Sequence, residues 1–200
     1  MISKFYLLAV LVLIISPVLV IAAQGNPRTG NTFEHVHALA MDAPGQIVFL
    51  GAHTGLFKSE DGGRSWRKVV LPTKHSHLDV MAVSPDPKAA KTLYIATHEA
   101  GVLKSSDAGV TWKDANTGLG GLDVHGFAID PNDGKLHAAV RERGEGIYRS
   151  TNGGAKWTRV DDGPGGEVKA LYSVNISAGM GGIVLYAATA EGLQRNPDCF

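Results

Sequence analysis

Short apolar stretches alternate with turn-forming residues along most of the chain, and they recur at a fixed interval. Near the start of each repeat a valine opens an apolar stretch, and these valines are 44 residues apart: Val36, Val80, Val124 and Val168. Two further β-rich stretches, bounded by Gly, Pro and Asp, follow in each repeat, which is typical of strands separated by turns. A last strand is expected after each repeat's tryptophan. Four strands in such a period predict one blade of a β-propeller.

The second and third stretches define the expected strands more closely. The second is expected at residues 47–52, 92–97, 135–140 and 183–189, and the third at residues 55–59, 101–105, 146–150 and 192–196. We therefore predict an all-β protein. Its repeats are expected at about residues 33–76, 77–120, 121–164 and 165–200, with the last one incomplete.

One motif, Ser-x-Asp/Asn-x-Gly-x-x-Trp, follows the third stretch in three repeats. Its members are Ser59, Asp61, Gly63 and Trp66; Ser105, Asp107, Gly109 and Trp112; and Ser150, Asn152, Gly154 and Trp157. The Asp or Asn is a short acceptor that holds a turn through nearby backbone N–H groups, and the glycine supplies a positive φ. Each indole is large enough to contribute substantially to a core. These residues are interpreted as structural.

The fourth repeat departs from the motif. Asn196 and Asp198 occupy the Ser and Asp positions, but the glycine, the tryptophan and the last strand are missing. About three complete blades and part of a fourth are expected. A truncated propeller, a small distorted propeller and a propeller completed by another chain all fit this pattern.

The N-terminus has a different character. Residues 1–23 contain one charge, Lys4, followed by an apolar run from Phe5 to Ala23, and Ala22-Ala23 resembles a signal-peptidase site. An uncleaved membrane anchor is the alternative, because the run is just long enough to span a bilayer. Either interpretation predicts that the propeller is exported, to the periplasm, the exterior or the outer side of a membrane. Residues 24–32 are expected to be a linker.

Charge, cysteine content and missing motifs argue against several classes of protein function. Lys plus Arg and Asp plus Glu each number 19, so no net field attracts nucleic acid. The one cysteine, Cys199, allows no intramolecular disulfide. No Gly-rich phosphate loop and no Gly-x-Ser-x-Gly elbow is present, so nucleotide-binding and Ser-His-Asp hydrolase classes have no support.

The repeated motif resembles the Asp-box (BNR) repeat family, which includes sialidases, sortilin-type receptors and photosystem assembly factors of the Ycf48 type. The segments Glu34-His-Val-His-Ala-Leu and Gly51-Ala-His-Thr-Gly-Leu-Phe-Lys-Ser are similar to bacterial secreted BNR-repeat glycosyl hydrolases. The resemblance implies the propeller fold. It implies no single activity, because one fold hosts many functions.

The register of the repeats also predicts a polar ligand face. Residues just before and just after the aligned valines are expected to point together, as are residues of the loops between strands two and three. With the loop that enters the second blade, this face comprises His35, His37, His53, His75, His77, Asp79, Met81, His98, Asp123, His125, Arg141, Arg143, Glu167 and Lys169. The remaining histidine, His137, aligns with Phe49 and Tyr94 and is expected to be a core or inter-strand residue.

Three functions are compatible with this face. A binding or assembly module with a protein or glycan partner is the first. A transition-metal site is the second, with zinc or copper held by His35, His37, His75 and His77, since imidazole suits these ions. A glycosyl hydrolase is the third, but it requires a carboxylate pair. Resemblance to sialidases implies three arginines, of which the face offers only Arg141 and Arg143, and the Phe/Tyr-Arg-Ile-Pro segment typical of sialidases is absent. The incomplete fourth blade further predicts self-association through an edge strand.

Overall fold

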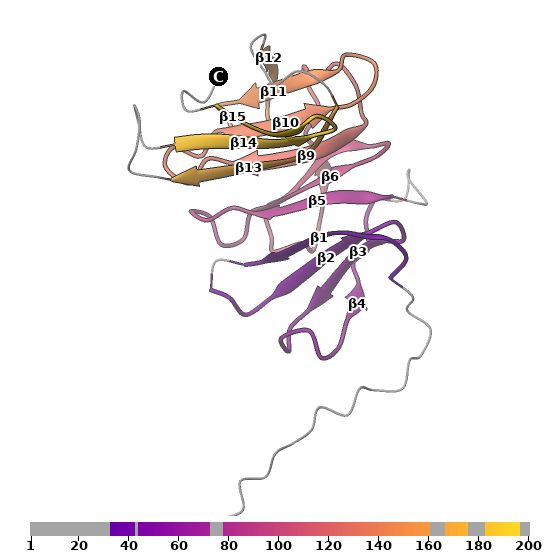
Figure 1. The fold of residues 1–200 in the computed structure, drawn as a ribbon. Coiled ribbons are helices and arrows are strands. Elements are labelled where there is room, and N and C mark those ends of the chain that lie inside the picture. The colour runs from indigo at the N-terminus through magenta and orange to yellow at the C-terminus, as the bar shows by residue number, and fades with distance from the viewer. Residues whose placement is uncertain (1–32, 43, 73–77, 161–166, 176–182, 197–200) are drawn as a thin grey trace, which may run out of the picture. The chain divides into compact units, whose positions relative to one another are not determined.

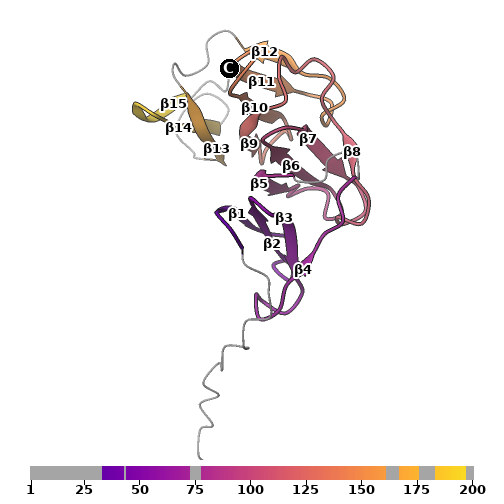
Figure 2. The same cartoon turned by 90° about the vertical axis from the view of Figure 1, so that its right-hand side faces the viewer.

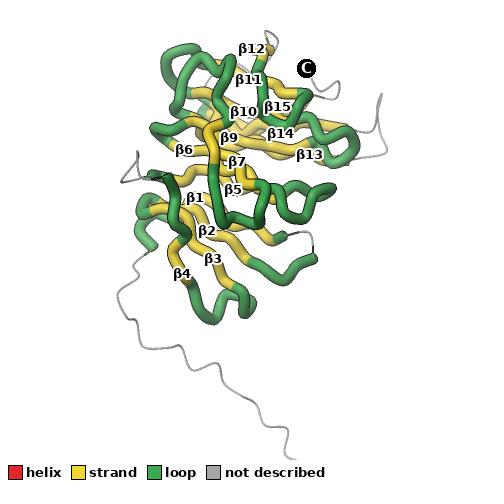
Figure 3. Tube along the Cα trace, turned by 180° about the vertical axis from the view of Figure 1, so that it is seen from behind, coloured by secondary structure: helices red, strands yellow, loops and turns green. Residues whose placement is uncertain are grey.

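The computed structural model describes residues 33–42, 44–72, 78–160, 167–175 and 183–196. These residues form strands and loops, without a helix (Figure 3). The first sheet contains β1 (Val36–Met41), β2 (Val48–Ala52), β3 (Gly55–Ser59) and β4 (Arg67–Lys68). The second contains β5 (Val80–Pro85), β6 (Leu93–Thr97), β7 (Gly101–Ser105) and β8 (Lys113–Asp114). The third contains β9 (Val124–Ile129), β10 (Leu136–Val140), β11 (Gly146–Ser150) and β12 (Thr158–Val160), and the fourth contains β13 (Val168–Asn175), β14 (Ile183–Thr189) and β15 (Gly192–Asn196).

The four sheets are the four blades of a propeller, as the sequence predicts. Each is an antiparallel meander in which strands adjacent in sequence pair with one another. The first strands of the blades are neighbours, with β1 beside β5, β5 beside β9, and β9 beside β13 (Figures 1 and 2). Three strands are present in the described part of the fourth blade, and residues 197–200 lie outside the description.

The core is divided among the junctions between blades. Phe49 and Ile95 belong to the cluster between the first and second blades, Phe127 and Leu136 to the next cluster, and Leu185 to the third. The motif tryptophans contribute to these junctions: Trp112 is 8% exposed in the first cluster and Trp157 is 2% exposed in the second. Each of these indoles fills the junction with the preceding blade.

Trp66 is less buried than the other two motif tryptophans, because no preceding blade among the described residues packs against it. It lies on the outer side of the first blade, where it is half-buried and contacts Phe33 edge to face at 5.7 Å. The first blade has no preceding blade among the described residues. The same motif residue therefore differs in burial because its neighbours differ.

The motif forms the turn that the sequence predicts. In the second blade, the Asp107 carboxylate accepts a hydrogen bond from the Thr111 N–H at 2.8 Å, and the Ser105 hydroxyl accepts one from the Gly109 N–H at 2.9 Å. Gly109 has φ +84°, a backbone conformation that favours glycine. Equivalent bonds hold the other two turns, with the acceptors Asp61 and Asn152. These bonds close local turns, as expected of a structural motif.

Two further predictions concern residues away from the blade turns. His137 is fully buried on β10, so its placement in the core is confirmed. The predicted signal or anchor and the linker, residues 1–32, lie outside the described residues, and the compact unit begins at Phe33. No helix among the described residues has the length and apolar character needed to cross a bilayer.

Candidate functional site

A β-bulge occurs near the start of every inner strand. In the first blade, Val36 pairs with Ala52 and Ala38 pairs with Gly51, which leaves His37 as the extra residue. The same irregularity recurs in the other blades, and the extra residues there are Met81, His125 and Lys169. A bulge redirects a side chain and commonly lies beside a functional site. The bulge was not predicted from the sequence, although all four of its residues were assigned to the ligand face.

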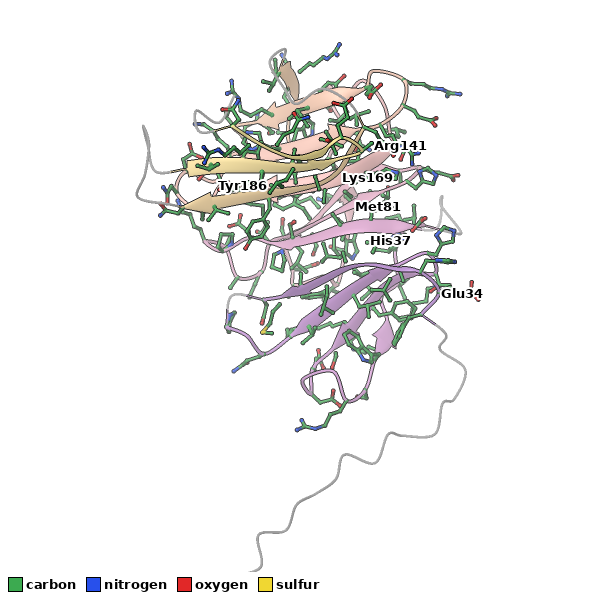
Figure 4. All side chains as sticks on the ribbon, viewed as in Figure 1. Glu34, His37, Met81, Arg141, Lys169 and Tyr186 are labelled. Carbon is green, nitrogen blue, oxygen red and sulfur yellow. The ribbon has the colours of Figure 1, made fainter. Side chains whose placement is uncertain are left out.

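Residues of the four inner strands line an open cavity of about 670 Å³. Small residues of these strands are among those that line it, including Ala38, Ala82, Gly126 and Ala170. The bulge residues lie at one end of the strands, which we call the channel mouth; Figure 4 shows His37, Met81 and Lys169 there, with Arg141 and Glu34 close to the same edge. The volume lies in the range of small-molecule sites, about 300–1,000 Å³.

The first cluster at the channel mouth joins the first two blades. His37 comes from the bulge of β1, His53 from the loop between β2 and β3, and Asp79 from the segment entering β5. His37 Nε2 lies 3.1 Å from Asp79 Oδ1, and His53 Nδ1 lies 2.7 Å from Asp79 Oδ2. The Asp79 side chain is 13% exposed and that of His53 is 56% exposed. The cluster is therefore anchored by a buried carboxylate and open to solvent through an imidazole.

The second cluster repeats these residue types one blade later. His98 Nδ1 lies 2.7 Å from Asp123 Oδ1, and His125 Nε2 lies 2.9 Å from the same oxygen. The hydrogen bond to Asp123 raises the pKa of His98, whereas burial lowers the pKa of His125. The two imidazoles that share one carboxylate thus differ in their protonation, and His98 is the one that carries the positive charge more readily.

The third junction uses different residues at the same positions. Arg141, which follows β10, lies 3.0 Å through Nε from Glu167 Oε1, in the segment entering β13. Its Nη1 also lies 3.5 Å from His125 Nε2, so this arginine links the second cluster to the third junction. Each of the three junctions between the described blades is therefore bridged at the mouth by a carboxylate and either an imidazole or a guanidinium.

Backbone hydrogen bonds place these side chains. The N–H of His98 donates to the carbonyl of Asp79 at 3.1 Å, and the N–H of Arg141 donates to the carbonyl of Asp123 at 2.8 Å. The equivalent bond in the fourth blade runs from Ala190 to Glu167 at 3.2 Å. The backbone of His98 and of Arg141 is thus bonded to the acidic residue of its own blade, while the side chain reaches the acidic residue of the next blade.

The remaining predicted residues lie as follows. Met81 and Lys169 line the cavity, and Arg143 is exposed in the loop between β10 and β11. His35 packs edge to face on His53, with ring centroids 5.4 Å apart. His75 and His77 fall outside the described residues. The pairing across blades was not predicted, although each acidic residue follows its loop partner at a nearly constant interval in the sequence.

Comparisons with curated proteins give xyloglucanases as relatives. A xyloglucanase from Paenibacillus sp is 30% identical over 141 residues, which cover 56% of this chain and 14% of that protein. Xyloglucanase Xgh74A from Acetivibrio thermocellus is 27% identical over 148 residues, covering 56% of this chain and 16% of that protein. The chain thus matches only a small part of the length of these enzymes.

Solved structures share the fold at low identity. An ancestral GH74 enzyme superposes with a TM-score of 0.64 at 17% identity, covering 86% of this chain and 24% of that one. A structure of YCF48 bound to D1 peptide superposes with a TM-score of 0.59 at 17% identity, covering 84% of this chain and 54% of that one. Residues 30–179 match the family model described as photosynthesis system II assembly factor YCF48. The resemblance drawn from the sequence is confirmed, and the chain belongs to the YCF48 family of BNR-repeat propellers.

Proposed function

We propose that this protein is an exported binding module that holds a peptide segment of a protein partner at the channel mouth. The observation that carries the proposal is the row of bridged blade junctions around the mouth of a 670 Å³ cavity. In each bridge the carboxylate is the less exposed partner. His53, His98 and Arg141 are the more exposed partners, with side chains 56%, 44% and 38% exposed. A peptide has the matching chemistry, because its backbone and carboxylates bond to such groups while an apolar side chain enters the cavity.

Family membership supports a peptide as the ligand class. The YCF48 structure that shares this fold is bound to a peptide of D1, and the family is described as assembly factors. The N-terminal apolar run supports export, since residues 5–23 are compatible with a signal peptide or an anchor. Cell fractionation of the untagged protein tests the location, and recovery in the cytosol would contradict export.

Binding can be tested with a phage-displayed library of random peptides. A selected peptide, labelled with a fluorophore, is then titrated with the protein and followed by anisotropy. Arg141→Ala and Lys169→Ala are expected to weaken binding by about tenfold each, the loss of one charge-assisted contact. Lys113→Ala, on the outer strand β8, is the matched control and is expected to leave the affinity unchanged. Failure to select any peptide, or equal loss in the control, would count against the proposal.

A hydrolase-like module is the second candidate, favoured by the xyloglucanase relatives. Glycoside hydrolysis uses two carboxylates about 5–10 Å apart. The acidic residues of the mouth, Asp79, Asp123 and Glu167, each contact an imidazole or a guanidinium, an arrangement that a binding role explains without chemistry. Release of reducing sugar from xyloglucan by the purified protein, abolished by Asp123→Asn, would favour the hydrolase instead.

Self-association is a further part of the proposed function. In the fourth blade, the edge strand β15 exposes Leu193 by 73%. Exposed apolar groups on an edge blade favour association with another chain. A second copy of this protein is the partner that we propose for this edge.

A further inference from the structure

We propose that His37, His53 and Asp79 bind a divalent transition-metal ion of the zinc class at the channel mouth. The three donor groups come from three separate segments that the fold brings together: β1, the loop after β2, and the segment entering β5. Two imidazoles and one carboxylate are an established ligand set for zinc, and they leave a coordination position for water. This site does not depend on peptide binding.

The geometry of Asp79 is the first support. One oxygen, Oδ2, contacts His53 Nδ1 at 2.7 Å. The other, Oδ1, is buried, and His37 Nε2 approaches it at 3.1 Å, yet it accepts no well-aligned hydrogen bond. A buried carboxylate oxygen without a hydrogen bond is costly. An ion shared by Asp79 and the imidazoles would satisfy this oxygen.

The distances permit one ion to reach all three groups. The donor atoms lie within 4.8 Å of one another. Two ligands at about 2.1 Å from a tetrahedral zinc ion are about 3.4 Å apart, so the imidazoles need to move by no more than about 1.4 Å. His53 is free to make that adjustment, because its side chain is 56% exposed on a loop. The same exposure gives the ion a path from solvent.

A third imidazole lies next to the site. The ring centroid of His53 lies 5.4 Å from that of His35 and 5.9 Å from that of His37. His35 adopts φ +46°, an uncommon conformation for a residue with a side chain. Its ring packs against that of His53 and helps to orient it.

The second cluster contains the same residue types with donor atoms equally close together, but an arginine beside it makes it less suited to an ion. Arg141 Nη1 lies 3.5 Å from His125 Nε2, so a guanidinium faces the nitrogen that would have to bind the metal. In addition, His98 and His125 share a single oxygen of Asp123. A cation at this position would meet an existing positive charge. The first cluster has Met81 at the bulge position that His125 occupies in the second.

Calorimetric titration of the full-length, untagged and metal-free protein with zinc chloride tests the proposal. We expect one equivalent of zinc to bind. His53→Ala and Asp79→Asn are each expected to reduce the zinc affinity by at least about tenfold. His98→Ala is the matched control, because it removes an imidazole of similar exposure from the second cluster, and it is expected to leave the affinity unchanged.

Each outcome decides the assignment. No zinc binding by the wild-type protein, or zinc binding that survives His53→Ala, would overturn it. A loss of affinity in His98→Ala equal to that in His53→Ala would also overturn it, because the ion would then belong elsewhere. Thermal unfolding checks that the variants fold, and the exposed position of His53 keeps one informative variant available if Asp79→Asn unfolds. Peptide binding that fails while zinc binds to these residues would leave this site in place and refute only the proposed function.

Discussion

Replacing His137 with phenylalanine is expected to stabilise the protein. His137 is fully buried on β10, and both of its ring nitrogens lack a hydrogen-bond partner among the described residues. The cross-strand register places it opposite Ala128 and Arg149. The equivalent positions in the first two blades hold the buried Phe49 and Tyr94. A phenyl ring is thus accommodated by the same fold at the same position.

The magnitude has two parts. Removing a buried polar group that lacks a partner is expected to contribute about 1–3 kcal/mol at neutral pH. The second part depends on pH, because burial lowers the pKa of His137 from 6.5 to about 4. The unfolded chain then binds a proton more readily than the folded one, so stability from this group is full above pH 6.5 and is lost as the pH falls towards 4. This shift corresponds to about 3 kcal/mol.

Urea unfolding at several pH values between 7 and 4, followed by tryptophan fluorescence, measures both parts. Trp112 and Trp157 are buried and report on the junctions between blades. The quantity of interest is the free energy of unfolding of His137→Phe minus that of the wild type, which cancels the titration of other groups. It should be positive at pH 7 and should grow as the pH falls. Phe49→His is the converse control and should introduce acid sensitivity.

A difference that does not change with pH would refute the interpretation of His137 as a buried neutral imidazole. A variant less stable than the wild type at pH 7 would show that the ring nitrogens have partners or that the larger ring is overpacked. His137→Leu separates these two explanations, because leucine removes the nitrogens without the full size of the phenyl ring.

Three other outcomes are expected. Trp112→Ala should lower the free energy of unfolding by about 3–5 kcal/mol through a cavity between blades, and Trp66→Ala should cost clearly less because that indole is half-buried; equal losses in urea unfolding would contradict this. Hydrogen bonds from Thr111 and Ser105 lower the pKa of Asp107 to about 2. The second-blade turn should therefore lose stability only as the pH falls from about 3.8 towards 2. Carboxyl NMR titration of the wild type and of Asp107→Asn measures this pKa. Leu193→Lys should reduce self-association in light scattering at high concentration, and an unchanged mass would argue against that edge.

The blades were predictable because their signals are local and repeated. The valine interval and the Asp-box turns depend on residues close together in sequence, and β14 and β15 begin and end as the sequence predicts. The different burial of Trp66 and Trp112 was not predictable from the motif, because burial depends on whether another blade packs against the indole.

Repeat register groups several of the mouth residues in the sequence, but it does not give their contacts. Repeat register assigned His37 and Asp79 to one face, but the regular two-residue alternation used for that assignment does not apply where a bulge inserts an extra residue. The contact between His53 and Asp79 depends on the angle between adjacent blades. That angle is set by side-chain packing across the whole junction, which no short motif encodes.

One backbone hydrogen bond at the channel mouth recurs in three blades, although the loop residue that donates it differs. The N–H of the loop residue donates to the carbonyl of the acidic residue whether the loop residue is His98, Arg141 or Ala190. The fold therefore does not depend on the side chain at this position. Because the backbone accommodates His, Arg or Ala at this position, the loop side chain can vary with the ligand. It is an imidazole at the first two junctions and a guanidinium at the third. Substitution of His53 should consequently change what the mouth binds while leaving the blades intact.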